Sequence, residues 1–225
     1  MSIHAVIFDL DDTLYPESQY VQGGYRAVAE HLRAQLGRAE RFEAWLWQRF
    51  LVGKSAGAFD AMNETFSLGF AAGQIQELVE VYRLHVPSIR PFGGMADLLG
   101  RLRGAYAIGL LSDGFLPAQR LKLQALDMER FFDEVIFTEE LGREFWKPST
   151  RGFELMAQKL GLPHEACCYV SDNPAKDFLP GNSLGWRTVQ YVRPGQIHSH
   201  NAAPSGGQPQ FIVRDGESLN RVLLK

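Results

Sequence analysis

The chain has 225 residues, of which 45% are hydrophobic and 22% are charged, and its formal net charge at pH 7 is −3. This composition is ordinary for a globular protein and suits one sizeable domain, or a core with a smaller insertion. The slightly acidic balance argues against a nucleic-acid partner, because binding a phosphate backbone needs a basic face. A small anionic substrate stays open, since a bound metal ion can reverse the local field.

The N-terminus and the cysteines favour the cytoplasm. The first residues, MSIHAVIFDLDD, lack the basic region of a signal peptide, and no apolar run approaches the roughly 20 residues that cross a bilayer. The only cysteines, Cys167 and Cys168, are adjacent. Neighbours in a strand point to opposite faces, so a disulfide between them would be strained. We therefore expect reduced thiols, a cytoplasmic protein and no membrane partner.

The first predicted element is a strand, and the region that follows it is helical. Residues 5–8 (AVIF) form a continuous apolar run that ends at Asp9. Residues 16–90 contain no convincing strand, and their helical patterns lie at 25–36, 42–51 and 74–84. We interpret residues 16–90 as an all-helical insertion, because this leaves the first strand free to pair with later ones. Three ordinary helices within a single domain are the alternative.

From residue 95 onward helices and strands alternate. The apolar runs typical of strands lie at 107–111, 135–137, 167–170, 188–192 and 211–213, and the helical segments at 95–103, 117–126, 150–160 and 218–224. Long continuous apolar runs are typical of strands that are covered on both faces in a parallel sheet. The sequence therefore predicts an α/β fold with a doubly wound, mainly parallel sheet, a core of residues 1–15 and 91–225, and a small all-helical domain at 16–90.

Residues 194–208 are rich in Pro, Gly, Ser, Asn and His, which predicts an exposed loop. His198 and His200 form a His-x-His pair that can bind metal. Without acidic partners in this loop, we expect no metal role for the pair.

Polar residues stand where three of the predicted strands end. Asp9, Ser112 and Asp172 each follow directly on an apolar run. The carboxyl ends of parallel strands form one edge of a sheet, where ligands bind. Lys147 comes shortly before the helix at 150–160, so it too can lie at this edge. The sequence therefore predicts that acids, a hydroxyl and a lysine converge on one site.

Phosphate ester hydrolysis explains this combination of side chains. A carboxylate can attack phosphorus and form an aspartyl-phosphate, which splits one hard displacement into two easier ones. Both partners are anionic, so a Mg²⁺ ion on oxygen ligands is needed between them. A lysine adds positive charge, and a hydroxyl can hold phosphate oxygens. A second carboxyl group can protonate the leaving alcohol and then activate water.

Four segments carry the polar residues of this predicted site: 8–13 (FDLDDT), 111–114 (LSDG), 146–148 (WKP) and 171–177 (SDNPAKD). In this order they resemble the first to fourth motifs of the haloacid dehalogenase-like (HAD) hydrolase superfamily, in its DxDxT phosphatase form. Their order and spacing agree with the family over residues 8–177. Ser171 departs from the pattern, because the family most often has glycine there. The resemblance implies a Rossmann-like core and a helical cap at 16–90, inserted between the first and second motifs, that closes over the site.

The resemblance also implies catalytic roles for three residues. Asp9 would be the nucleophile and a metal ligand. Asp11 would be the general acid and base, and its backbone carbonyl would also reach the metal. Lys147 would neutralise the nucleophile and the phosphate.

Further roles concern binding. By the same resemblance, Ser112 and Asp113 of the second motif would bind the substrate phosphate, and Thr13 would orient the first-motif loop against it. Asp172 would bind Mg²⁺, and Asp177 would support the metal site without touching the ion. Asp12 receives no role.

The resemblance favours a Mg²⁺-dependent phosphatase of a small phosphorylated metabolite, such as a nucleoside monophosphate or a sugar phosphate. A phosphoryl transferase or mutase needs the same intermediate and stays open. The family's dehalogenases lack the second aspartate of the first motif, which is present here as Asp11. A non-catalytic binding module would be favoured by loss of a catalytic residue, and none is lost. The substrate and the oligomeric state are not encoded in these motifs.

Overall fold

The computed structural model describes residues 2–37 and 41–224. The chain divides into two compact units, one made of Met1–Ser18 with Ile89–Lys225 and the other of Gln19–Ser88. We call them the core unit and the helical unit. Within the described residues, no helix is both long and apolar enough to span a bilayer.

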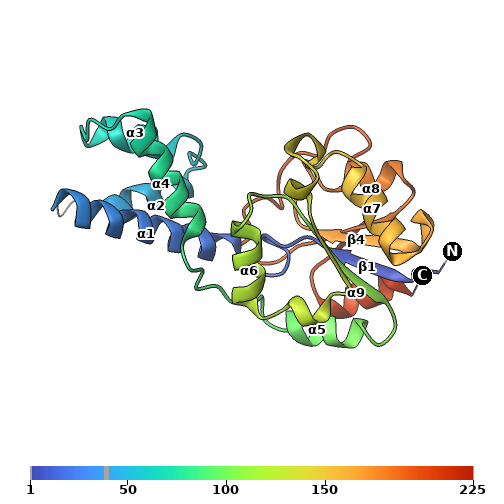
Figure 1. The fold of residues 1–225 in the computed structure, drawn as a ribbon. Coiled ribbons are helices and arrows are strands. Elements are labelled where there is room, and N and C mark those ends of the chain that lie inside the picture. Colours follow the sequence, from blue (N-terminus) through green and yellow to red (C-terminus); the bar gives the residue numbers. More distant parts are fainter. Residues whose placement is uncertain (1, 38–40, 225) are drawn as a thin grey trace. The chain divides into compact units, whose positions relative to one another are not determined.

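The core unit is built on a six-stranded sheet in the order β3-β2-β1-β4-β5-β6, in which every neighbouring pair is parallel (Figure 1). The strands are β1 (Ala5–Phe8), β2 (Ala107–Ser112), β3 (Glu134–Phe137), β4 (Cys167–Ser171), β5 (Arg187–Tyr191) and β6 (Phe211–Val213). β1 and β4 are buried along their whole length, as continuous apolar strands in the middle of a parallel sheet should be. The predicted doubly wound α/β fold is confirmed.

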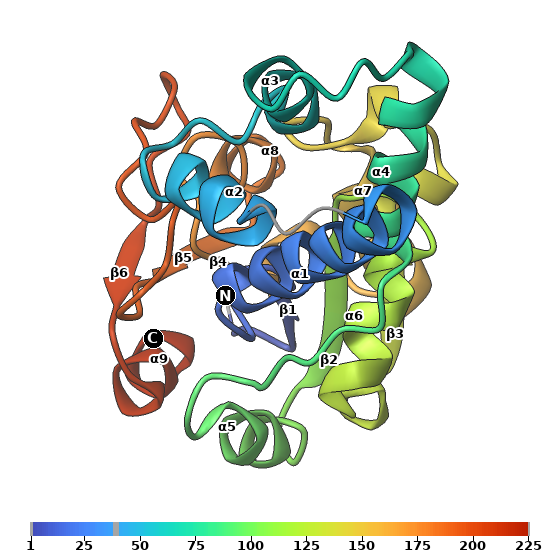
Figure 2. The same ribbon diagram turned by 90° about the vertical axis from the view of Figure 1, so that its left-hand side faces the viewer.

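Helices cover both faces of this sheet. They are α5 (Met95–Leu102), α6 (Ala118–Leu126), α7 (Arg151–Leu160), α8 (Phe178–Ser183) and α9 (Gly216–Leu223). α7 and α8 lie on one face, and α5 and α9 lie together on the other (Figures 1 and 2). On the first face, Phe153 and Met156 of α7 pack with Ile7 of β1 and Tyr169 of β4 in a buried cluster. This packing fixes the sheet and its carboxyl edge as one rigid support for a site.

The sequence pattern did not predict α8. Its residues, FLPGNS, include Pro180 and Gly181, which usually end helices. Gly181 is required by packing, because a Cβ there would lie 2.9 Å from the side chain of Thr188.

Cys167 and Cys168 are free and buried, and burial raises the pKa of each thiol to about 12.

The helical unit is organised around an aromatic core. Its helices are α1 (Glu17–Leu36, which begins in the core unit), α2 (Phe42–Leu51), α3 (Ala58–Thr65) and α4 (Ala72–Leu84). Tyr25 of α1 stacks obliquely on Tyr82 of α4 with ring centroids 5.6 Å apart, and Phe59 of α3 lies edge-on to both rings. Short α3 was not predicted, and α1 begins at Glu17 instead of Tyr25. Gly23 and Gly24 interrupt the helical pattern, so the sequence did not indicate the turns that precede them.

Candidate active site

Three loops at the carboxyl edge of the sheet carry the predicted site. Asp9 follows β1, Ser112 ends β2, and Asp172 follows β4. In the register of the sheet, Phe8 of β1 pairs with Leu110 of β2 and with Val170 of β4. Asp9 lies one residue beyond this register, and Ser112 and Asp172 lie two residues beyond it. All three therefore meet at the same edge, as expected for parallel neighbours.

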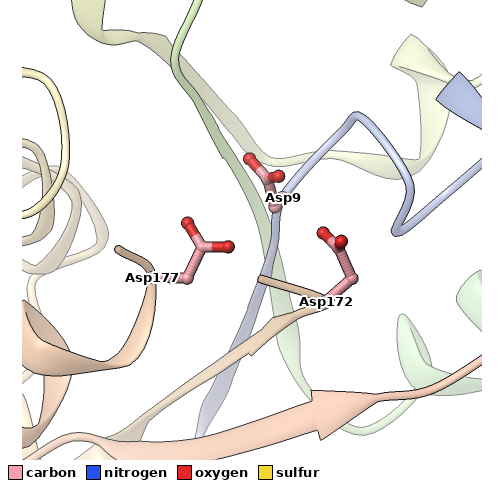
Figure 3. A group of neighbouring side chains, drawn as sticks. All are labelled: Asp9, Asp172 and Asp177. Atoms are coloured by element: carbon pink, nitrogen blue, oxygen red, sulfur yellow. The ribbon is translucent and has the colours of Figure 1, made fainter. Parts of the chain in front are cut away.

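Three buried carboxylates form the centre of the site (Figure 3). Asp9, Asp172 and Asp177 each offer an oxygen, and these oxygens lie within 4.8 Å of one another. Burial, together with the charges of Asp177 and Asp9, raises the pKa of Asp172 well above its ordinary value. Burial also raises the pKa of Asp9, to about 7, although Lys147 opposes this shift. The cluster thus concentrates negative charge that the described protein groups only partly balance.

Lys147 supplies the balancing charge from within the protein. Its Nζ lies 2.9 Å from Asp9 Oδ1 and 2.8 Å from Asp177 Oδ1, and it donates a hydrogen bond of 2.8 Å to the Tyr169 hydroxyl. Burial opposes its charge, but Asp177 and Asp9 outweigh burial and hold the Lys147 pKa well above its ordinary value. Lys147 therefore stays an ammonium beside Asp9.

The acid cluster fits a divalent cation. Its donors are all carboxylate oxygens, which Mg²⁺ and similar hard ions prefer. Asp172 Oδ2 is buried and has no hydrogen-bond partner among the residues that the structure describes, although buried polar atoms are normally satisfied. Its other oxygen lies 3.4 Å from the Thr13 hydroxyl. An ion held by Asp9 and Asp172 would supply the missing contact. The Asp11 carboxylate is not part of this cluster, and a metal contact through the Asp11 backbone carbonyl stays a prediction.

The Asp11 carboxylate faces α6 instead. Lys122 Nζ lies 2.8 and 2.9 Å from its two oxygens, and Gln119 Nε2 lies 3.0 Å from Oδ2. The Tyr15 hydroxyl also donates to Oδ1. Burial would raise the Asp11 pKa, but the Lys122 charge and these hydrogen bonds outweigh it and lower the pKa. Sequence reasoning missed Lys122 and Gln119, although both stand among apolar positions of a helical pattern.

Ser112 and Asp113 are held by neighbours from other elements. The Ser112 hydroxyl accepts a hydrogen bond of 2.8 Å from Gln119. The Asp113 carboxylate accepts from the Thr138 hydroxyl at 2.8 Å and from the Lys147 backbone N–H at 3.2 Å. Asp113 thus links the backbone at Lys147 to the second-motif loop. Substrate contact by Ser112 and Asp113 stays a prediction.

Asp12 has a structural role that its sequence did not reveal. It adopts a positive φ of 54° and is fully buried. Its carboxylate accepts hydrogen bonds from the backbone N–H groups of Glu17, at 2.7 Å, and Ile197, at 2.6 Å. These bonds attach the segment around Ile197 to the first-motif loop. His198 consequently reaches the site and pairs with Glu17 at 3.2 Å, where the sequence predicted an exposed loop.

A pocket of about 350 Å³ opens over these groups, entirely within the core unit. Its lining combines acids, cations, aromatic rings and amides: Asp9, Asp11, Glu17, Asp113, Gly114, Phe115, Gln119, Lys122, Trp146, Asp172, Asn173, Lys176 and His198. The lining offers the ammonium groups of Lys122 and Lys176 to a small anionic molecule, together with the Asp9 carboxyl group.

The sequence and the fold match known hydrolases. The family model of the haloacid dehalogenase-like hydrolases matches residues 3–185. A glyceraldehyde 3-phosphate phosphatase of Methanopyrus kandleri is 30% identical over 98% of this chain and 97% of its own. An (S)-2-haloacid dehalogenase of Pseudomonas fluorescens is 28% identical over 82% of each chain. The putative HAD hydrolase YfnB of Bacillus subtilis, crystallised with magnesium, superposes with a TM-score of 0.70 over 99% of each chain at 18% identity. The chain therefore belongs to the haloacid dehalogenase-like hydrolase family.

Proposed function

We propose that this hydrolase is a Mg²⁺-dependent phosphatase that cleaves small phosphate monoesters through an aspartyl-phosphate on Asp9. The observation that carries the proposal is the buried contact of Lys147 with Asp9 beside two further carboxylates. A nucleophile that must attack an anion needs this neutralisation. The full-length likeness to a glyceraldehyde 3-phosphate phosphatase supports a phosphorylated metabolite of similar size.

In the proposed first step, an Asp9 oxygen bonds to phosphorus and the bond from phosphorus to the ester oxygen breaks. The ester oxygen leaves with a proton from the Asp11 carboxyl group, which must first take up that proton because the Lys122 charge favours its carboxylate form. In the second step, Asp11 takes a proton from the water that attacks the aspartyl-phosphate, and phosphate is released. The two proton transfers balance over the cycle. A bound Mg²⁺ would lower the repulsion between Asp9 and the phosphate and polarise its oxygens.

Asp11 separates this reaction from dehalogenation, the second candidate. A halide is a stable anion and leaves without a proton, whereas an alcohol is a poor leaving group unless it is protonated. A carboxyl group two residues after Asp9 that can give a proton to the ester oxygen and take one from water is what an ester reaction needs, and Lys122 and Tyr15 hold Asp11 in that place. Dehalogenation is tested as well, because the chain is similar to an (S)-2-haloacid dehalogenase.

One experiment compares both reactions. Purified protein is assayed for phosphate release from glyceraldehyde 3-phosphate and an aryl phosphate, and for halide release from a 2-haloacid, with Mg²⁺ and after exhaustive treatment with EDTA. We expect phosphate release only, abolished by EDTA and restored by Mg²⁺. Halide release, or full phosphatase activity after chelation, would overturn the proposal.

A further inference from the structure

We propose that Lys122 and Gln119 of α6 are positioning residues that hold the Asp11 carboxylate for its proton transfers and link it to Ser112. This inference rests on the proposed function. It adds to the site two residues that lie outside all four sequence motifs.

The burial of these side chains is the first argument. Gln119 is 1% exposed and Lys122 is 6% exposed. They are three residues apart in α6, so they share one face of the helix. A core-facing helical position ordinarily holds an apolar residue, and lysine is almost never buried so deeply unless it is paired. Their burial therefore requires the partners that they find at the site.

Lys122 determines the direction of the Asp11 carboxylate. Its ammonium contacts both carboxylate oxygens, at 2.8 and 2.9 Å. A single donor bridging two oxygens restrains rotation of the carboxylate, and Tyr15 holds Oδ1 from a second element. The Asp11 side chain is 20% exposed, whereas that of Lys122 is 8% exposed. Both side chains line the pocket, and Asp11 is the more accessible of the two.

Gln119 connects Asp11 to the second motif. Its Nε2 lies 3.0 Å from Asp11 Oδ2, 2.8 Å from Ser112 Oγ and 2.7 Å from the Asp113 carbonyl oxygen. An amide nitrogen carries two hydrogens, so one of these three acceptors is left open at any time. The contact with Oδ2 is the longest. The bond to Oδ2 is thus the one that Gln119 gives up most readily, so a water molecule can donate to Oδ2 in its place while Lys122 keeps its contact there.

Gly114 makes room for this arrangement. It has a φ of 139°, and a Cβ there would lie 2.7 Å from the Gln119 side chain. The glycine of the second motif thereby lets the Gln119 amide reach three acceptors from one position.

The two residues should affect different kinetic constants. Lys122 restrains the Asp11 carboxyl group, which acts on the ester oxygen and on water. Loss of this restraint should misplace both proton transfers and lower kcat, although the Lys122 charge also lowers the Asp11 pKa. Gln119 also holds Ser112, which we propose to bind the substrate phosphate, so its loss should raise KM as well. If both residues only stabilised the fold, their substitutions would not separate into one that changes kcat and one that changes kcat and KM.

The test uses the full chain with Mg²⁺ and an alkyl phosphate whose turnover has been established. Lys122→Met keeps the side-chain length and removes the charge. We expect kcat to fall roughly 10- to 100-fold with KM little changed, which is the range seen when a residue that orients a metal ligand is replaced. Lys122→Arg should recover most of the loss, and Gln119→Met should change both constants. Lys159→Met is the matched control, because it removes an exposed ion pair of 2.8 Å to Glu134 and should leave activity unchanged.

A double-mutant cycle shows whether Lys122 acts through Asp11. In an Asp11→Asn background, Lys122→Met should cause no further loss. Lys122→Met alone leaves the Asp11 carboxylate buried without its cation, whereas the double variant has no charge at either position. Comparing the melting curves of these two variants shows whether a loss of activity comes from a loss of folding. If the two losses multiply while the wild type turns over, the inference fails and the proposed function stands. If the wild type releases no phosphate from any ester, both fail.

Discussion

Lys147 is the residue on which the charge balance of the site depends. It is 1% exposed at its side chain and lies between Asp9 and Asp177. Burying a charge without a partner is strongly unfavourable, so each member of this group stabilises the others only while all are present. The same contact serves catalysis, because it brings a positive charge to the proposed nucleophile.

Replacing Lys147 by methionine should therefore destabilise the fold as well as abolish turnover. The variant leaves Asp9 and Asp177 buried without their cation, which typically costs about 3–5 kcal/mol. Added Mg²⁺ should recover part of the loss, because it binds the same carboxylates in the folded state. Chemical denaturation with and without Mg²⁺ measures both effects. Lys159→Met, which removes an exposed pair, should cost at most about 1 kcal/mol; an equal loss in the two variants would contradict the account.

Metal binding should depend on pH through Asp9 and Asp172. Burial and neighbouring acids raise the pKa of both groups, so protons compete with the metal for these oxygens near neutral pH. Binding should release protons, and the apparent Kd for Mg²⁺ should rise as the pH falls through about 7. Calorimetry in two buffers of different ionisation enthalpy would detect the release. An affinity that stays constant from acid to neutral pH would argue against this site.

At the residue scale, sequence reasoning was effective wherever a side chain stands at a strand end. Asp9, Ser112 and Asp172 could be brought together because parallel strands share an edge. Lys122 and Gln119 could not, because the pattern of α6 shows which helix they belong to but not which face of the sheet it covers. His198 was missed for another reason: its loop is held by the Asp12 carboxylate, a contact between residues far apart in the chain.

At the scale of elements, α1 illustrates how packing overrides propensity. Glycine weakens a helix interior, and the pair Gly23–Gly24 lies inside α1. The reason is the approach of α4: a Cβ on Gly24 would lie 2.4 Å from the Tyr82 ring. A sequence pattern cannot supply this partner, which explains why α1 was predicted to begin at Tyr25.

Gly24→Ala should therefore destabilise the helical unit despite the better helix propensity of alanine. Overpacking of this kind typically costs about 1–3 kcal/mol. Gly73→Ala in α4 is the matched control, since a Cβ there meets no atom of the described residues within 4 Å. It should be neutral or stabilising by up to about 1 kcal/mol. Urea unfolding of both variants decides the matter; equal stability would show that Tyr82 does not require the glycine.

At the scale of the whole molecule, the candidate active site belongs to the core unit, and α2, α3 and α4 belong to the helical unit. All residues of the acid cluster and its pocket belong to the core unit, and Gln19–Ser88 forms a compact unit of its own. The sequence predicted a division at residues 16 and 90, because the pattern of apolar strands stops at β1 and resumes with β2, and this division into two domains stays a prediction. We propose that the helical unit acts as the cap and influences substrate choice.

Exchanging Gln19–Ser88 for the corresponding segment of the Methanopyrus kandleri relative tests this division. We expect the preference among phosphate esters to change, while inhibition by EDTA and the effect of Asp9→Asn stay the same. The measurement is kcat/KM over a panel of phosphorylated metabolites. An unchanged preference in a folded chimera would show that the core unit alone selects the substrate.

The most direct test of the central claim is to trap the phosphorylated nucleophile. Asp11→Asn leaves Asp9 able to attack but removes the group that activates water, an effect typically worth ~100- to 10,000-fold. With an activated aryl phosphate, whose leaving group needs little protonation, the intermediate should accumulate. Mass spectrometry after brief incubation with Mg²⁺ and acid quench should find phosphate on Asp9 in Asp11→Asn and none in Asp9→Asn. Phosphate on a serine or histidine, or near-normal turnover by Asp9→Asn, would contradict the assignment of Asp9 as the nucleophile.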